Sequence, residues 1–212
     1  VLPQDLPLQE LDAAIRWVKR QPVRWDTPLV LSPRATVADA LRLLPSLPGH
    51  GIVVADQRGG EPLERADVRG ILPAPRLATA LPDAALGDLV HAGPVALAAE
   101  DIGEGRAAYD AIDAADAEIV LVLDRGHVVG TLTPRTALRS SLYRPAVDAS
   151  GRLAVSAAVG INGDVAGKAR ALASAGVDVL VIDTAHGHQE GMLRALQTVA
   201  GLDLGIPLVA GN

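Results

Sequence analysis

The fold is decided by residues 179–188, which read Val-Leu-Val-Ile-Asp-Thr-Ala-His-Gly-His. The first four residues form an uninterrupted apolar run, which is typical of a strand buried on both faces in a parallel sheet. Polar residues begin at Asp183, where that strand is expected to end. Ligands and catalytic groups of parallel α/β proteins lie at the carboxyl ends of the strands. The stretch therefore predicts a ligand edge, and the alternative is that Asp183 and Thr184 only cap the next helix.

The sequence around this stretch, from residue 150 to residue 212, alternates short apolar strands with helices. The expected order is strand 153–159, helix 164–175, strand 177–182, helix 189–200 and strand 207–210. This alternation predicts parallel βαβ units. A polar group follows each strand, namely Asn162, Asp183 or Asn212. Three such groups at one edge of a parallel sheet favour a ligand-binding role over helix capping.

Residues 1–20 predict one more strand and helix. Val1 and Leu2 form a short strand that ends at Pro3, and apolar residues then recur at steps of three and four. This spacing indicates an amphipathic helix. We expect it to start near Asp5, with Pro7 in its first turn.

Residues 23–143 contain a weak internal repeat of the order strand, helix, strand, strand, helix. The first copy is expected at 28–31, 37–44, 51–55, 68–72 and 74–81, and the second at 94–97, 105–115, 118–123, 127–132 and 134–142. Pro75-Arg-Leu-Ala78 matches Pro134-Arg-Thr-Ala137 at the start of the last helix of each copy. Asp124-Arg-Gly126, between two β-branched runs, predicts a tight hairpin. Each copy can bury the sheet face of the other.

Composition excludes several classes of protein. The chain has no cysteine, so it contains neither disulfides nor a thiol nucleophile. A net charge of -6 argues against binding to DNA. No apolar run approaches the roughly 20 residues of a membrane span, and no signal peptide is visible, so we expect a cytoplasmic protein. His186 and His188 stand two residues apart without cysteines or dense carboxylates nearby, so no metal site is predicted.

The residues of three segments resemble a known family. Ala157-Ala-Val-Gly-Ile-Asn162, Val179 to His188 and Pro207-Leu-Val-Ala-Gly-Asn212 are similar to successive barrel strands of IMP dehydrogenases and GMP reductases. Val1-Leu-Pro-Gln-Asp5 and its helix look like the second strand and helix of that barrel. In this family a tandem CBS pair is inserted after that helix, where the internal repeat lies. Three stretches look closest to the actinobacterial IMP-dehydrogenase-related branch, which is thought to act as a GMP reductase: Val1-Leu-Pro-Gln-Asp-Leu-Pro7, Val159-Gly-Ile-Asn-Gly-Asp164 and His186-Gly-His-Gln189.

The resemblance implies an α/β fold, in which a partial (β/α)₈ barrel is interrupted by a tandem CBS pair of α+β type. The implied domains are a barrel fragment (1–22), a first CBS unit (23–89), a second CBS unit (90–145) and a barrel fragment of three strands and two helices (146–212). A complete barrel needs about 250 residues. We therefore expect the barrel pieces to associate in a homo-oligomer that covers their apolar surface.

The implied activity is that of a purine-nucleotide oxidoreductase. The substrate would be GMP, reduced to IMP with NADPH, or IMP, oxidised to XMP with NAD. The resemblance assigns cofactor binding to Asp183, which would hold the nicotinamide ribose, and to Thr184, Ala185, His186, Gly211 and Asn212. The family's catalytic cysteine and its loop would lie beyond Asn212, so we predict no catalytic residue here and no activity from these 212 residues alone.

CBS pairs often hold adenosine nucleotides with a Gly-apolar-apolar-Ser/Thr-x-x-Asp motif. Gly130-Thr-Leu-Thr133 fits its first part, but Thr136 replaces the aspartate, and the first unit has Pro73 and Arg76 at the corresponding polar positions. Arg76 and Arg135 are candidates for binding phosphate, or else solvated residues at helix starts. Purine nucleotide binding by the pair thus depends on Gly130, Thr133, Arg76 and Arg135. The alternative function is a stand-alone CBS module that senses nucleotides.

Overall fold

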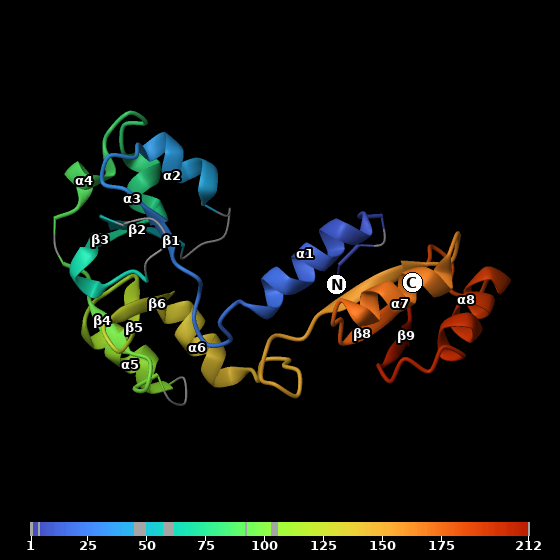
Figure 1. Cartoon of the computed structure of the whole chain (residues 1–212). Coiled ribbons are helices and arrows are strands. Elements are labelled where there is room, and N and C mark those ends of the chain that lie inside the picture. Colours follow the sequence, from blue (N-terminus) through green and yellow to red (C-terminus); the bar gives the residue numbers. More distant parts are fainter. Residues whose placement is uncertain are drawn as a thin grey trace. The chain divides into compact units, whose positions relative to one another are not determined.

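The computed structural model describes residues 2–3, 5–44, 50–56, 62–91, 93–102 and 106–211. The chain forms two compact units, of which unit 1 comprises Val1–Gln21 and Ala146–Asn212 and unit 2 comprises Pro22–Pro145. Unit 2 is therefore an insertion in the sequence of unit 1. Each unit has its own apolar core, and Figure 1 shows the elements of both.

Unit 1 is built on a parallel sheet. Its strands are β7 (Ser156–Gly160), β8 (Val179–Asp183) and β9 (Leu208–Ala210), hydrogen-bonded in that order. Leu2 adds a parallel bridge to Ala157 on the other side of β7, with its amide 2.8 Å from the Ser156 carbonyl oxygen. Leu2 of the expected N-terminal strand thus lies beside the three-stranded sheet as an isolated bridge, and Val1 lies outside the described residues.

Three helices cover this sheet. They are α1 (Leu8–Lys19), α7 (Val165–Ser174) and α8 (Glu190–Ala200). Leu11 and Ile15 of α1, with Leu172 and Met192 of the other two helices, are buried against the strands. The expected start of α1 near Asp5 is wrong, because the helix begins after Pro7, whose carbonyl accepts the first helical bond at 3.0 Å. A residue before proline avoids the helical conformation, so Leu6 cannot belong to the helix.

The internal repeat of the sequence is also a structural repeat in unit 2. The first copy consists of β1 (Leu29–Leu31), α2 (Val37–Leu43), β2 (Gly51–Ala55), β3 (Val68–Pro73) and α3 (Ala74–Thr79). The second copy consists of β4 (Ala96–Ala98), α5 (Arg106–Ala114), β5 (Val120–Asp124), β6 (His127–Leu132) and α6 (Pro134–Leu142). Two short helices, the 3-10 helix Arg65–Asp67 and α4 (Leu86–Leu89), were not predicted.

The two copies share their strand pairing and one irregularity. In each copy the first strand pairs in parallel with the second, and the second pairs antiparallel with the third. The register shifts within the antiparallel pair at the same place, between Val54 and Ala55 and between Val122 and Leu123. The predicted hairpin between β5 and β6 is confirmed, with positive φ angles at Arg125 (49°) and Gly126 (87°).

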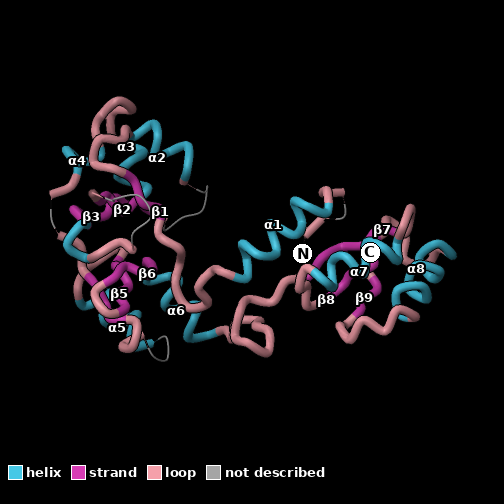
Figure 2. The backbone as a smooth tube through the Cα atoms, viewed as in Figure 1, coloured by secondary structure: helices cyan, strands magenta, loops and turns pink. Residues whose placement is uncertain are grey.

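The sheets of the two copies pack against each other. Val53, Ala55 and Val68 of the first sheet share an apolar cluster with Leu121 and Val128 of the second. Figure 2 shows α2 and α3 beside the first sheet and α5 and α6 beside the second. Antiparallel bridges also join Asp26 to Thr131 and Glu64 to His127, so segments of the first copy lie along the edge of β6. Unit 2 is therefore a single body made of two similar halves.

Candidate functional site

The carboxyl ends of β7, β8 and β9 form one edge of the sheet in unit 1. Gly160 is paired with Asp183, and Ile182 is paired with Ala210, so the three strands end at neighbouring positions. Strand β8 therefore delivers Asp183 between the residues that follow the other two strands. The predicted ligand edge has this backbone geometry.

Asp183 is half-buried at the end of β8. Within the described part of the chain, its carboxylate makes no hydrogen bond or ion pair. Helix α8 begins at Glu190 with Gln189 at its N-cap and has no side-chain cap. The alternative that Asp183 or Thr184 caps this helix is therefore wrong, because the helix starts seven positions after Asp183 and its N-cap is Gln189.

Thr184 is buried, with 8% of its surface exposed, and its hydroxyl accepts a hydrogen bond from Gln189 Nε2. The backbone N–H of Gln189 donates to the His186 carbonyl at 3.3 Å. Ala185 and His186 are exposed on the turn between these contacts. Gln189 therefore fixes the loop that carries three of the predicted residues. Sequence reasoning missed this role, because a glutamine that precedes a helix carries no specific signal.

Gly211 brings backbone close to the end of β8. Its amide donates to the Ile182 carbonyl at 2.9 Å. A Cβ at this position would lie 2.9 Å from Val181 Cγ1 and 3.0 Å from Ile182 O, which is tighter than real contacts allow. A side chain here would force Val181 or the end of β8 to shift, so glycine suits this close approach of backbone to a neighbouring strand. Asn212 lies outside the described residues.

The chemistry of Asp183 allows it to bind a diol such as that of a ribose. A carboxylate is an acceptor-only group, and a ribose diol presents two hydroxyl donors. The half-buried Asp183 carboxylate, with no partner among the described residues, has the free acceptor capacity that such a diol needs.

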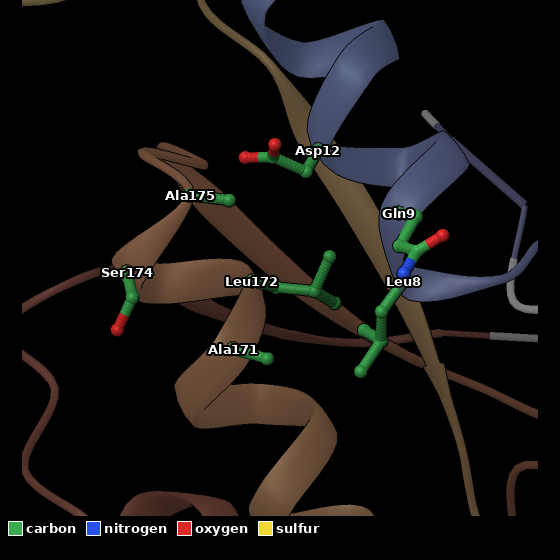
Figure 3. A pocket seen from close by; sticks show the side chains of 7 residues that line it. All are labelled: Leu8, Gln9, Asp12, Ala171, Leu172, Ser174 and Ala175. Carbon is green, nitrogen blue, oxygen red and sulfur yellow. The ribbon is translucent and has the colours of Figure 1, made fainter.

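Two hollows of unit 1 are lined by residues other than Asp183. One, of about 350 Å³, is lined by the loop after β7 and by α8, and it includes Asn162, Asp164 and Arg194. The other, of about 330 Å³, lies between α1 and α7, where Leu8 faces Ala171 and Leu172 (Figure 3). Asn162 follows β7 as expected and lines the first hollow, whereas Asp183 is not among the residues that line it.

The four residues predicted to bind nucleotide in unit 2 are not brought together in one cleft. Arg76 lines a hollow of about 270 Å³ with His91, Asp116 and Glu118. The other three residues do not line it. Arg135 is exposed, and Thr133 is buried at the N-cap of α6, where its hydroxyl lies 3.0 Å from that of Thr136.

The close packing of Trp25 explains why a glycine stands at position 130. A Cβ there would lie 2.7 Å from Cγ of Trp25, whose ring packs on the strand and donates from Nε1 to the Val129 carbonyl at 3.1 Å.

Next to Trp25, burial raises the pKa of Asp26, although His50, Thr136 and Arg139 act in the opposite direction. Asp26 is a polar residue of this region that the sequence did not single out.

The described part of the chain holds no group of three or more His, Cys, Asp or Glu side chains arranged to bind a metal ion. None of its helices is long and apolar enough to cross a membrane.

Comparison with known proteins identifies the family. The family described as IMP dehydrogenase / GMP reductase domain matches residues 1–212. The GMP reductase of Mycobacterium tuberculosis is 42% identical over 213 residues, which cover 100% of this chain and 42% of that protein. The inosine-5'-monophosphate dehydrogenase of Bifidobacterium longum is 29% identical over 219 residues, which cover 100% of this chain and 39% of that protein.

Solved structures show the same fold. GMP reductase from Trypanosoma brucei in complex with guanosine 5'-triphosphate superposes with a TM-score of 0.62 at 24% identity, over 99% of this chain and 50% of that one. A variant of the same enzyme in complex with guanosine 5'-monophosphate gives a TM-score of 0.61 at 24% identity, over 97% of this chain and 44% of that one. The chain thus spans half or less of the length of these relatives. With a family match that runs through both units, the chain belongs to the IMP dehydrogenase / GMP reductase family.

Proposed function

We propose that the chain is part of a purine-nucleotide oxidoreductase, and that the whole protein is a GMP reductase that converts GMP to IMP with NADPH. The observation that carries this proposal is the half-buried Asp183 carboxylate, without a partner among the described residues, at the carboxyl edge of a parallel sheet. The identity of 42% to a GMP reductase, against 29% to an IMP dehydrogenase, favours the reductase direction. The second candidate is an NAD-dependent IMP dehydrogenase that forms XMP.

Each residue of the edge has a proposed role. Asp183 accepts hydrogen bonds from the ribose hydroxyls of the cofactor, and Thr184, held by Gln189, keeps the loop with Ala185 and His186 beside it. Gly211 lets the backbone approach the cofactor, and Asn212 supplies an amide. When bound, the nicotinamide supplies the hydride exchanged with purine C2. The chain contains no cysteine, so we propose that these 212 residues alone do not turn over substrate.

We also propose a domain assignment: residues 1–22 and 146–212 belong to a (β/α)₈ barrel, and residues 23–89 and 90–145 form a CBS pair. The repeated pairing pattern and the repeated register shift support the CBS assignment. The hollow that contains Arg76 is where a purine nucleotide would bind to the pair, with the guanidinium facing phosphate. A stand-alone CBS sensor is disfavoured, because the family match extends through both parts of unit 1.

The test is nicotinamide absorbance with the full-length protein, supplied with either GMP and NADPH or IMP and NAD⁺. Oxidation of NADPH that requires GMP is the expected result. Reduction of NAD⁺ that requires IMP would instead make the protein a dehydrogenase. No turnover with either pair would overturn the assignment to a purine-nucleotide oxidoreductase.

A further inference from the structure

The chain crosses from unit 1 to unit 2 after Gln21 and returns after Pro145. The segments next to both crossings are joined by one side chain, that of Lys19, the last residue of α1. Lys19 Nζ donates to Asp148 Oδ2 at 2.9 Å and to Asp178 Oδ2 at 2.6 Å. Asp148 lies three residues after the return crossing, and Asp178 directly precedes β8.

These three charged side chains are shielded from water. The side chains of Lys19 and Asp148 are 8% and 10% exposed, and that of Asp178 is 23% exposed. Most other ion pairs of the described residues are more exposed, such as that between Arg16 and Asp12 on the same helix. An ion pair shielded in this way is screened little by salt, and removal of one partner leaves a charge without compensation.

Both carboxylates also hold backbone amides. Asp178 Oδ2 accepts from the Val155 amide at 2.6 Å, directly before β7. Asp148 Oδ1 accepts from the amides of Ser150 and Arg152 at 2.9 and 3.0 Å, and Arg152 Nε donates to Asp148 Oδ2 at 2.9 Å. The second group of bonds shapes a hairpin in which Val147 is bridged to Leu153. The positive charges of Lys19 and Arg152 balance the negative charges of Asp148 and Asp178.

We propose that Lys19, Asp148 and Asp178 form a clamp that fixes both crossings to the amino-terminal ends of β7 and β8 as one rigid base. The clamp joins residues 129 and 159 positions apart in the sequence, so the chain's connectivity alone does not impose it. All three residues belong to unit 1, and the clamp does not depend on the proposed activity.

The test is hydrogen–deuterium exchange of the full-length protein, read at the amides of Ser150, Arg152 and Val155. The change Lys19→Met is expected to speed exchange at these amides at least tenfold, while the centres of β7 and β8 change less than twofold. Lys19→Arg keeps a cation at this position, so it is expected to retain most of the protection of these amides from exchange. The matched control is Arg16→Met, which removes an exposed cation from the same helix and should change nothing.

Two results would overturn the clamp. One is unchanged exchange at the three amides in Lys19→Met, and the other is faster exchange throughout unit 1, which would indicate general destabilisation. If Lys19→Met does not fold, Asp178→Asn is the second variant, since it keeps the shape of the side chain. In that variant faster exchange confined to Val155 and the hairpin supports the clamp, and unchanged exchange contradicts it. Because no activity is measured, this result is independent of the proposed function.

Discussion

Asp183 is unusual among the acidic residues of unit 1 because its half-buried position is not matched by a partner in the described structure. We expect Asp183→Ala to raise KM for the nicotinamide cofactor of the full-length protein by about tenfold or more, since a hydrogen bond to a charged group contributes roughly 1.5–3 kcal/mol. The free energy of unfolding should change by less than about 0.5 kcal/mol, because no internal contact is lost. Glu190→Ala, an exposed carboxylate at the start of α8, is the control and should leave KM unchanged. An unchanged KM in Asp183→Ala would refute the role.

Gly130 provides a second test at the scale of one residue. A methyl group there would overlap the ring of Trp25, so Gly130→Ala is expected to destabilise unit 2 by about 2 kcal/mol through overpacking. The chain has two tryptophans, Trp17 and Trp25, so a Trp17→Phe background leaves Trp25 as the fluorescent reporter of denaturant unfolding. Gly93→Ala is the matched control, because its nearest neighbour would be 3.7 Å away. Equal stability of the two variants would show that Trp25 moves aside at little cost.

Helices α2 and α6 begin with the same arrangement of hydrogen bonds, a capping box. In each helix a threonine hydroxyl accepts from the amide three residues on, and the side chain at that position accepts from the threonine amide: Thr36 with Asp39, and Thr133 with Thr136. Loss of such a cap costs about 1 kcal/mol. Thr36→Ala should therefore lower the free energy of unfolding of unit 2 by about that amount in the Trp25 fluorescence assay. Thr79→Ala, at the exposed end of α3 in the same unit, is the control, and an equal loss there would contradict the capping argument.

Asp148, in the hairpin that bridges Val147 to Leu153, should make the free energy of unfolding depend on pH. The Lys19 ammonium, with the Arg152 backbone amide and side chain, holds the pKa of Asp148 well below its ordinary value of 3.8. The carboxylate therefore stabilises the fold fully above pH of about 4, and this contribution is lost as the pH falls below the unfolded-state pKa. The difference in unfolding free energy between the wild type and Asp148→Asn should shrink as pH falls from about 6 to about 3. Asp113→Asn, an exposed control, should show no such trend, and a constant difference for Asp148→Asn would refute the argument.

The elements that the sequence predicted well are those with a strong local pattern. Residues 179–182 are continuous and apolar, and the strand found is Val179–Asp183. Pro134 at the first turn gives α6 its predicted bounds, Pro134–Leu142. The helix Leu86–Leu89 was missed, because four residues are too few to show helical periodicity.

At the scale of the whole molecule, contacts between distant residues could not be predicted. The Lys19 ion pairs and the packing of Trp25 on Gly130 join residues more than 100 positions apart, and neither leaves a periodic signal in the sequence. In the candidate site, too, the sequence predicted one part and missed another. The edge with Asp183 was predictable because parallel strands place their carboxyl ends together. The role of Gln189 was not, because it depends on the conformation of one loop.

The last whole-molecule feature is the edge of the sheet in unit 1. Of the strands described, only β8 pairs with β9, and Val209 is 45% exposed there. An unpaired strand edge that carries apolar side chains is a template for association with another chain. We therefore expect the 212-residue chain to self-associate in sedimentation equilibrium, and Val209→Lys to weaken that association at least fivefold. Leu142→Lys is the matched control, because Leu142 is an exposed apolar residue (68%) on α6 of unit 2 and lies on no sheet edge. If Leu142→Lys dissociates the assembly and Val209→Lys does not, the chains associate through unit 2, and the open edge of β9 has no part in it.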